Sequence, residues 1–403
     1  MKSKQLASLV VGLVGVALVA LLVSLLVERP ERAGEGNVKT KVIPGFPLND
    51  VSAIAISAKG ASLNLTRKDG VWGVKERNGY HADFTKIGTL LRDVYDLGIV
   101  QRVLVGPSKF GRVGLLDPTN KDAKDEEKPV VLAFRNDKGD EVANLWVGKE
   151  YKKEEQSQFG TYDQTAGRYV KTPKGDDVYL VAQQFESAKT DPASWLDKGF
   201  FQVNKVKSIE RAGSPEQSWK LVRDSDTADF KLADAKPGEE LDKDKVSSMK
   251  NAFSSPSFED VMVGEGVQKP SKITFKVETF EGFRYEVKLG DKDASNDFLL
   301  TVDVSADLPK QRVAPAKESD EDKKANDKKF EEEQKKLKQK LEKEKALKGF
   351  VYKVHGWVID SINKDRKEIM VEKKKDEPKK EEPKKDGASI PGLDSSVPGL
   401  APK

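Results

Sequence analysis

Apolar and polar residues alternate along several short segments of this chain, with the period of two that is typical of a β-strand with one buried face. The segment VSAIAIS covers residues 51–57, and LNLTR at 63–67 and VWGVKE at 71–76 follow it. KDG lies between the last two segments. Its Asp-Gly pair favours a tight hairpin turn, because glycine accepts a positive φ. We therefore predict an antiparallel sheet that is rich in hairpins.

A helical period begins after residue 83. Asp83 precedes a set of apolar residues that recur at spacings of three and four, as on one face of a helix. These residues are Phe84, Ile87, Leu90, Leu91 and Val94. A carboxylate just before a helix can accept hydrogen bonds from the free N–H groups of the first turn. We predict that Asp83 caps this helix and that His81, just before the cap, is a surface histidine.

The same order of patterns occurs a second time along the chain. Asp242 corresponds to Asp83, and the segment ITFKVETFEGFRYEVKLGDK at 273–292 corresponds to VVLAFRNDKGDEVANLWVGK at 130–149. Loops of different length separate the matching segments, as insertions between equivalent units would do. We interpret the pattern as two copies of one module. The alternative is a chance likeness between two unrelated hairpin-rich domains.

The predicted fold class is therefore α+β, with two repeated modules of mainly antiparallel sheet plus helix. The first module is expected at residues 48–199 and the second at 200–371. Residues 317–348 are almost entirely charged, with Glu and Lys at the i,i+4 spacing that supports a helix. We predict a solvated helical or disordered insertion there. The Lys-, Glu- and Pro-rich tail at 372–403 is predicted to be disordered.

The N-terminus carries a long uncharged stretch. Residues 6–27 contain no charge over 22 positions, and a helix of that length spans roughly 33 Å, enough for a bilayer core of about 30 Å. We predict an uncleaved transmembrane signal anchor here, followed by a linker at 28–47. Lys2 and Lys4 would keep residues 1–5 in the cytoplasm. A cleaved signal peptide is the alternative.

Small residues recur along one side of the predicted anchor. Such residues let two helices approach closely in lipid, so this side is a possible helix-packing face. Its members are Ser8, Gly12, Gly15, Ala20 and Ser24. The alternative is that small residues are simply common in such segments.

Composition limits the partners and the reactive groups that can be expected of this chain. The 403 residues include 71 basic and 67 acidic side chains that are interleaved, so we predict no nucleic-acid partner. Cysteine is absent, which removes disulfides, thiolate nucleophiles and cysteine-based metal sites. The only two histidines are His81 and His355. Both are interpreted as surface residues, because no further ligand stands near either at a recognisable spacing.

Short motifs that could carry chemistry are incomplete. The loop GPSKFGRV at 106–113 has two glycines but lacks the Lys-Ser/Thr pair of a phosphate-binding loop. Ser247 and Lys250 match SxxK without its companion motifs. The carboxylate-rich segments at 224–229 and 291–297 lack the glycine and distal glutamate of a calcium loop. We therefore assign no catalytic, cofactor-binding or metal-binding residue and no cofactor.

A family resemblance runs through the segments IAIS, LNLTRKDGVWGV, YHADFTKIGTLLRDV, GLLDP, VGK, RYV, DVYLV and DPASWLD. Together they resemble the bacterial family catalogued as domain of unknown function 4340, closely over residues 51–260 and more loosely to 369. The resemblance implies an N-terminal membrane anchor and an extracytoplasmic part. It also implies an association with ABC transporters of the gliding-motility type.

These observations lead to a functional hypothesis. We expect a non-enzymatic accessory or scaffold protein of the bacterial envelope, single-pass in the inner membrane through its N-terminal helix, with its bulk in the periplasm. Its expected partner is an ABC-type transporter component or another envelope protein. The alternative is an extracytoplasmic module that binds a small molecule or glycan between the repeats. Glycosidase chemistry with carboxylates alone is a third possibility.

Overall fold

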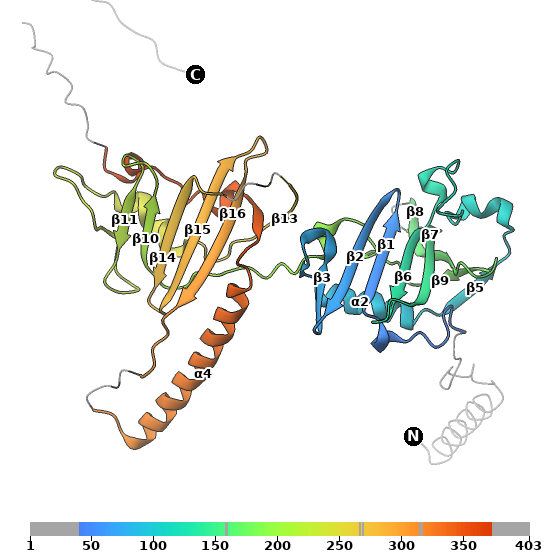
Figure 1. The fold of residues 1–403 in the computed structure, drawn as a ribbon, viewed down its shortest axis with the longest axis horizontal. Coiled ribbons are helices and arrows are strands. Elements are labelled where there is room, and N and C mark those ends of the chain that lie inside the picture. Colours follow the sequence, from blue (N-terminus) through green and yellow to red (C-terminus); the bar gives the residue numbers. More distant parts are fainter. Residues whose placement is uncertain are drawn as a thin grey trace, which may run out of the picture.

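The computed structural model (Figure 1) describes residues 40–372 apart from 158–159, 266, 268–269, 313 and 315–316. Two antiparallel sheets lie side by side in it. The first has nine strands in the order β4-β3-β2-β1-β6-β7-β8-β9-β5. The second has eight strands in the order β12-β11-β10-β14-β15-β16-β17-β13. Apart from the additional strand β4, the two orders correspond strand by strand, so both sheets follow one plan.

The strands of the first sheet are β1 (Ala53–Ala58), β2 (Ala61–Lys68), β3 (Val71–Val74), β4 (Tyr80–His81), β5 (Ile99–Val103), β6 (Val130–Arg135), β7 (Glu141–Ser157), β8 (Gly160–Lys171) and β9 (Val178–Val181). Those of the second sheet are β10 (Val206–Ala212), β11 (Trp219–Val222), β12 (Lys231–Leu232), β13 (Asp260–Met262), β14 (Ile273–Thr279), β15 (Phe283–Lys292), β16 (Asp297–Ala306) and β17 (Val351–His355). The α-helices are α2 (Phe84–Tyr95), α3 (Lys243–Ser247) and α4 (Asp320–Lys345). Short 3-10 helices are η1 (Leu48–Asp50), η2 (Lys75–Arg77), η3 (Pro107–Val113), η4 (Asp125–Glu127), η5 (Pro192–Trp195), η6 (Ser248–Asn251), η7 (Gly356–Val358) and η8 (Arg366–Ile369).

The fold-class prediction was wrong. Antiparallel sheet makes up most of the described chain and helices are few. The second module shows why the helical content was overestimated. Its helix α3 has Val246 as its only buried residue before the chain tightens into η6, where Met249 is buried. A helix with so short an apolar stripe gains too little from packing to continue.

The predicted membrane anchor concerns residues that the structure does not describe. Within the residues that the structure describes, no helix combines the length and the apolar character needed to cross a membrane. Residues 6–27 lie outside the described residues, and so does the tail from 373. The proposed packing face lies outside them too: Ser8, Gly12, Gly15, Ala20 and Ser24.

The local predictions in the first sheet are confirmed. Asp69 and Gly70 both have positive φ, at 51° and 82°, as the tight turn between β2 and β3 requires. The Asp83 carboxylate accepts hydrogen bonds from the Thr85 and Lys86 N–H groups at 3.0 and 3.1 Å. Asp242 caps α3 in the same way. The turn and the helix caps therefore form where the local sequence predicts them.

Helix α2 packs on one face of the first sheet. Its buried residues join the same hydrophobic cluster as the inward side chains of β1 and β2: Ile87, Leu90, Leu91 and Val94 with Ile54, Ile56, Leu63 and Leu65. Phe84 is the exception among the predicted face, because its side chain is 72% exposed.

Both sheets end in the same way. After the last strand the chain returns to the helix cap, where the Asp83 N–H donates to the Trp195 carbonyl and the Asp242 N–H donates to the Ile369 carbonyl. The sheets differ in one connection. In the first sheet, β8 leads to β9 through the short segment 172–177. In the second, the connection from β16 to β17 contains α4, which projects away from the sheet (Figure 1).

Candidate functional site

The two sheets meet at an ion pair. Arg77, in η2 of the first module, donates through Nε and Nη2 to the two carboxylate oxygens of Asp260 in β13, at 2.7 and 2.6 Å. Both side chains are mostly buried. The hydrogen bonds to Asp260 raise the pKa of Arg77. A bidentate pair of this kind fixes direction as well as distance, so it sets how the first sheet sits on the edge of the second.

An aromatic cluster fills the space beside this ion pair. Tyr80 from β4 makes edge-to-face contacts with Phe258, Phe350 and Tyr352 of the second module, with ring centroids 4.9 to 5.9 Å apart. Phe200, in the segment between the modules, packs on Phe258 and Tyr352. Burial raises the pKa of Tyr80 to about 12. These rings form a continuous core between the sheets.

A cleft of about 390 Å³ opens next to the aromatic cluster. Three parts of the chain form its walls: β4, the intermodule segment 197–200, and the C-terminal end of α4 with the residues that follow it to Phe350. Its apolar lining residues are Tyr80, Phe200, Leu347 and Phe350, and its polar ones are His81, Asp197, Lys343 and Glu344. Pockets at the interface between domains with a few polar groups over an apolar surface are common ligand sites.

Glu344 fixes the α4 wall of this cleft. It is 5% exposed, and its carboxylate accepts hydrogen bonds from the Gln202 N–H at 2.8 Å and the Tyr285 hydroxyl at 2.9 Å. Burial raises the pKa of Glu344. Its oxygens are therefore committed to holding α4 on the second sheet and on the intermodule segment.

The remaining polar groups of the cleft are available. His81, Asp197 and Lys343 are exposed. Among the residues that the structure describes, neither the His81 ring nor the Lys343 ammonium has a hydrogen-bond or ion-pair partner. One Asp197 oxygen accepts from the Gly199 N–H at 2.9 Å. The cleft thus combines unpaired donors with a carboxylate acceptor.

A carboxylate–histidine cluster lies near the β13 edge of the second sheet, the edge that also carries Asp260. Ligand atoms of Glu259, Asp297 and His355 all lie within 4.8 Å of one another. However, the Lys353 ammonium contacts Glu259 at 2.9 Å and Asp297 at 3.0 Å, and the His355 Nδ1 atom lies 2.7 Å from Asp297. The hydrogen bonds to Lys353 and His355 lower the pKa of Asp297. A divalent cation would have to displace this ammonium, so the cluster fits an ion-pair network better than a metal site.

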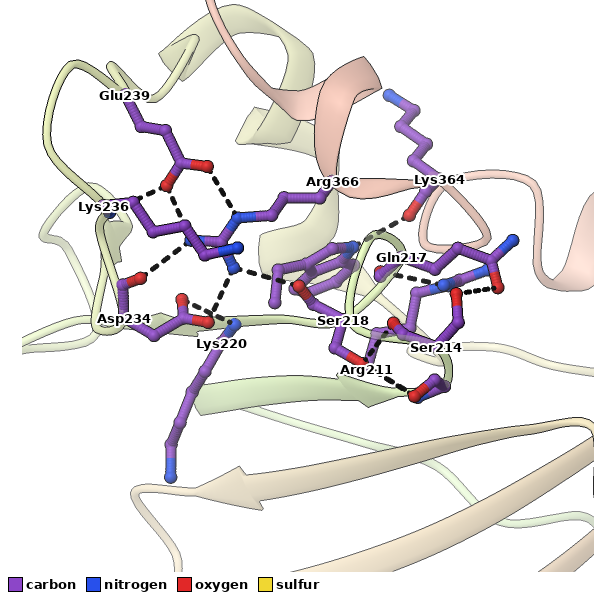
Figure 2. Close-up of polar contacts among 12 residues, drawn as sticks. Arg211, Ser214, Gln217, Ser218, Lys220, Asp234, Lys236, Glu239, Lys364 and Arg366 are labelled. Carbon is purple, nitrogen blue, oxygen red and sulfur yellow. Dashed lines mark hydrogen bonds and ion pairs between the residues drawn. The ribbon is translucent and has the colours of Figure 1, made fainter.

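A buried arginine ties the end of the second module to its first strands (Figure 2). Arg366 donates through Nε and Nη2 to Glu239 and through Nη1 to Asp234, at 2.7 to 2.9 Å. Its other two hydrogen bonds reach the carbonyls of Ser218 and Asp234. The hydrogen bonds from Arg366 lower the pKa of Glu239 to about 2. Every N–H of the guanidinium is used, which is the mark of a structural contact.

The two histidines, which were both predicted to be surface residues, have different surroundings in the structure. His81 is exposed as predicted, but it lies on the wall of the cleft. His355 is half-exposed and contacts the buried Asp297, which sequence reasoning missed. The alternation in VYKVH was the available signal, because it places Lys353 and His355 on one face of a strand. Their partner lies too far away in sequence for a spacing rule to find.

The incomplete motifs do not form sites in the described residues. The glycine loop at 106–113 is η3, with Phe110 buried in a small hydrophobic cluster. Lys250 pairs with Asp229 at 2.8 Å, and the Ser247 hydroxyl donates to a backbone carbonyl. The acidic segment at 224–229 is neutralised by neighbouring basic side chains.

The fold and the junction define the class of protein: two antiparallel sheets of one plan that meet at an ion pair and an aromatic cluster. The chain belongs to the family described as Domain of unknown function (DUF4340), whose model matches residues 72–277. No curated protein and no solved structure matches the chain.

Proposed function

We propose that this chain is a non-enzymatic accessory protein of the bacterial envelope that binds another envelope protein, such as a membrane component of an ABC-type transporter. The observation that carries the proposal is the exposed helix α4. Its 26 residues extend over roughly 39 Å. Glu344 is its only buried residue. Leu337 and Leu341 pack partly against the core of the chain, whereas the other face of the helix is exposed and well placed to contact a partner.

Two further features support a binding role. The ion pair and the aromatic cluster hold the two sheets together. The Arg366 contacts tie the second module to itself, so these polar groups are engaged with one another. The uncharged stretch at residues 6–27 supports a place at the inner membrane, with the sheets outside the cytoplasm. The transporter as partner follows from the family resemblance.

Site-specific photocrosslinking of the full chain in native membranes tests this function. Benzoylphenylalanine replaces Glu332, an exposed residue of α4, and a matched variant carries it at the exposed Lys59 in the turn between β1 and β2. We expect one defined adduct from position 332 and none from position 59, with a transporter component or another envelope protein identified by mass spectrometry.

Two results would contradict the proposal. One is the same set of abundant proteins at both positions, which would mean that α4 has no specific partner. The other is recovery of the full chain in the soluble fraction after carbonate washing, which would remove the membrane placement.

A further inference from the structure

The junction cleft depends on a segment that distinguishes the two modules. One of its walls is the C-terminal end of α4, which lies in the connection from β16 to β17. The corresponding connection in the first module, 172–177, contains no helix. The shared plan of the two sheets therefore does not require this wall. Glu344 nevertheless holds it in place by hydrogen bonds to Gln202 and Tyr285.

The surface of the cleft combines two kinds of contact. The half-buried rings of Phe200 and Phe350 belong to its apolar lining. The polar lining residues offer donors from His81 and Lys343 and an acceptor from Asp197. Sugar rings present apolar C–H groups on their faces and hydroxyls, which both donate and accept, at their edges. Aromatic rings next to mixed donors and acceptors match that combination.

The charge of the cleft indicates a neutral ligand. Lys343 is positive and Asp197 is negative, and neither has a partner of opposite charge among the described residues, while Glu344 is already engaged. These two charges of opposite sign line the same cleft and offset each other for a bound ligand, so neither an anion nor a cation gains much from Coulomb attraction. The volume of about 390 Å³ lies within the range of small-ligand sites.

We propose that this cleft binds a neutral saccharide, with a ring face against Phe200 and Phe350 and hydroxyls on His81, Lys343 and Asp197. This site goes beyond the protein-binding function proposed above and does not depend on it. Because the ligand would touch β4, the intermodule segment and α4 together, its binding would change the surroundings of residues in both modules.

Calorimetry and saturation-transfer NMR on the full chain test the site with three neutral probes: chitotetraose, cellotetraose and maltotetraose. We expect saturable binding of at least one probe with a Kd of about 1 mM or tighter. His81→Ala and Lys343→Ala should each weaken it about five- to tenfold, since each removes one hydrogen bond to the ligand. Ala346→Trp should abolish binding, because Ala346 is an exposed lining residue and the indole would fill the cleft.

Matched controls come from the same surfaces. Lys338→Ala removes an exposed lysine of α4 outside the cleft, and Trp357→Ala removes an aromatic side chain that is 58% exposed elsewhere. Both should change the Kd by less than about twofold. Absence of binding by all three probes, binding that survives Ala346→Trp, or an equal loss in Trp357→Ala would each overturn the proposal. The α4 crosslink from position 332 should persist in Ala346→Trp, so failure of the saccharide site and failure of the partner are distinguishable.

Discussion

At the scale of single residues, buried arginines connect segments that the hydrophobic core alone does not hold. Arg366 is 4% exposed and brings the C-terminal segment to the loop that precedes α3. Moving a guanidinium out of water is costly, and only complete pairing offsets that cost. Glu239 and Asp234 supply this pairing, so their ionisation becomes part of the stability of the fold.

The acid dependence of stability follows from Glu239. Its pKa in the folded protein is about 2, below the ordinary 4.5, so the unfolded chain binds this proton more tightly. The stabilisation from the Glu239 carboxylate is therefore complete above about pH 4.5 and is lost as the pH falls towards 2. We expect Glu239→Gln to be less stable than the natural chain at pH 7, and this difference to shrink towards pH 2.

Urea unfolding followed by tryptophan fluorescence at pH values from 7 to 2 measures this effect. Glu240→Gln is the matched control, because Glu240 is the exposed neighbour. A difference between Glu239→Gln and the natural chain that stays constant with pH would show that the carboxylate charge is not responsible.

At the scale of elements, two aspartates do the same work on helices of different length. Asp83 caps the 12-residue α2 and Asp242 caps the 5-residue α3, each accepting two backbone hydrogen bonds. Each cap pairs N–H groups that the helix leaves free. The cap is a property of the first turn, so its contribution should not depend on how far the helix continues.

Replacing each cap tests this independence. Asp83→Ala and Asp242→Ala should each lower the free energy of unfolding by about 1 kcal/mol, while the Asn variants at the same positions retain most of it. Chemical denaturation of the four variants provides the measurement. If Asn costs as much as Ala, the negative charge near Lys86 and Lys245 matters more than the hydrogen bonds.

The elements also show what could be predicted from sequence. The Asp69-Gly70 turn and the Asp83 cap are encoded by neighbouring residues, so local rules found them. The length of α3 depends on how much apolar surface it buries, and the sequence pattern predicted its capping residue, Asp242, but no length. A site between the repeats was considered, but its lining could not be predicted, because it brings together Tyr80, Phe200 and Phe350, which are far apart in sequence and meet only once both sheets have formed.

At the scale of the whole molecule, the two sheets share one hydrophobic core. The main buried cluster runs from Ile54 in the first sheet through Tyr80 to Phe258 and Tyr352 in the second. The Arg77–Asp260 pair closes this junction at its edge. A shared core couples the unfolding of the two modules, because neither sheet can unfold without exposing the aromatic side chains of the other.

We expect this coupling to appear as one cooperative transition in calorimetry of the natural chain, and to weaken when the junction is broken. Arg77→Ala should cost about 1–3 kcal/mol, since it leaves the mostly buried Asp260 carboxylate without its partner. The double variant Arg77→Ala/Tyr80→Ala should show two unfolding transitions in place of one. Arg284→Ala is the control, because its pair with Glu278 is exposed and should contribute less than about 1 kcal/mol.

Two separate transitions in the natural chain would mean that the modules unfold independently. A single transition in the double variant would place the coupling elsewhere, with Phe200 and the intermodule segment as the remaining contact between the sheets.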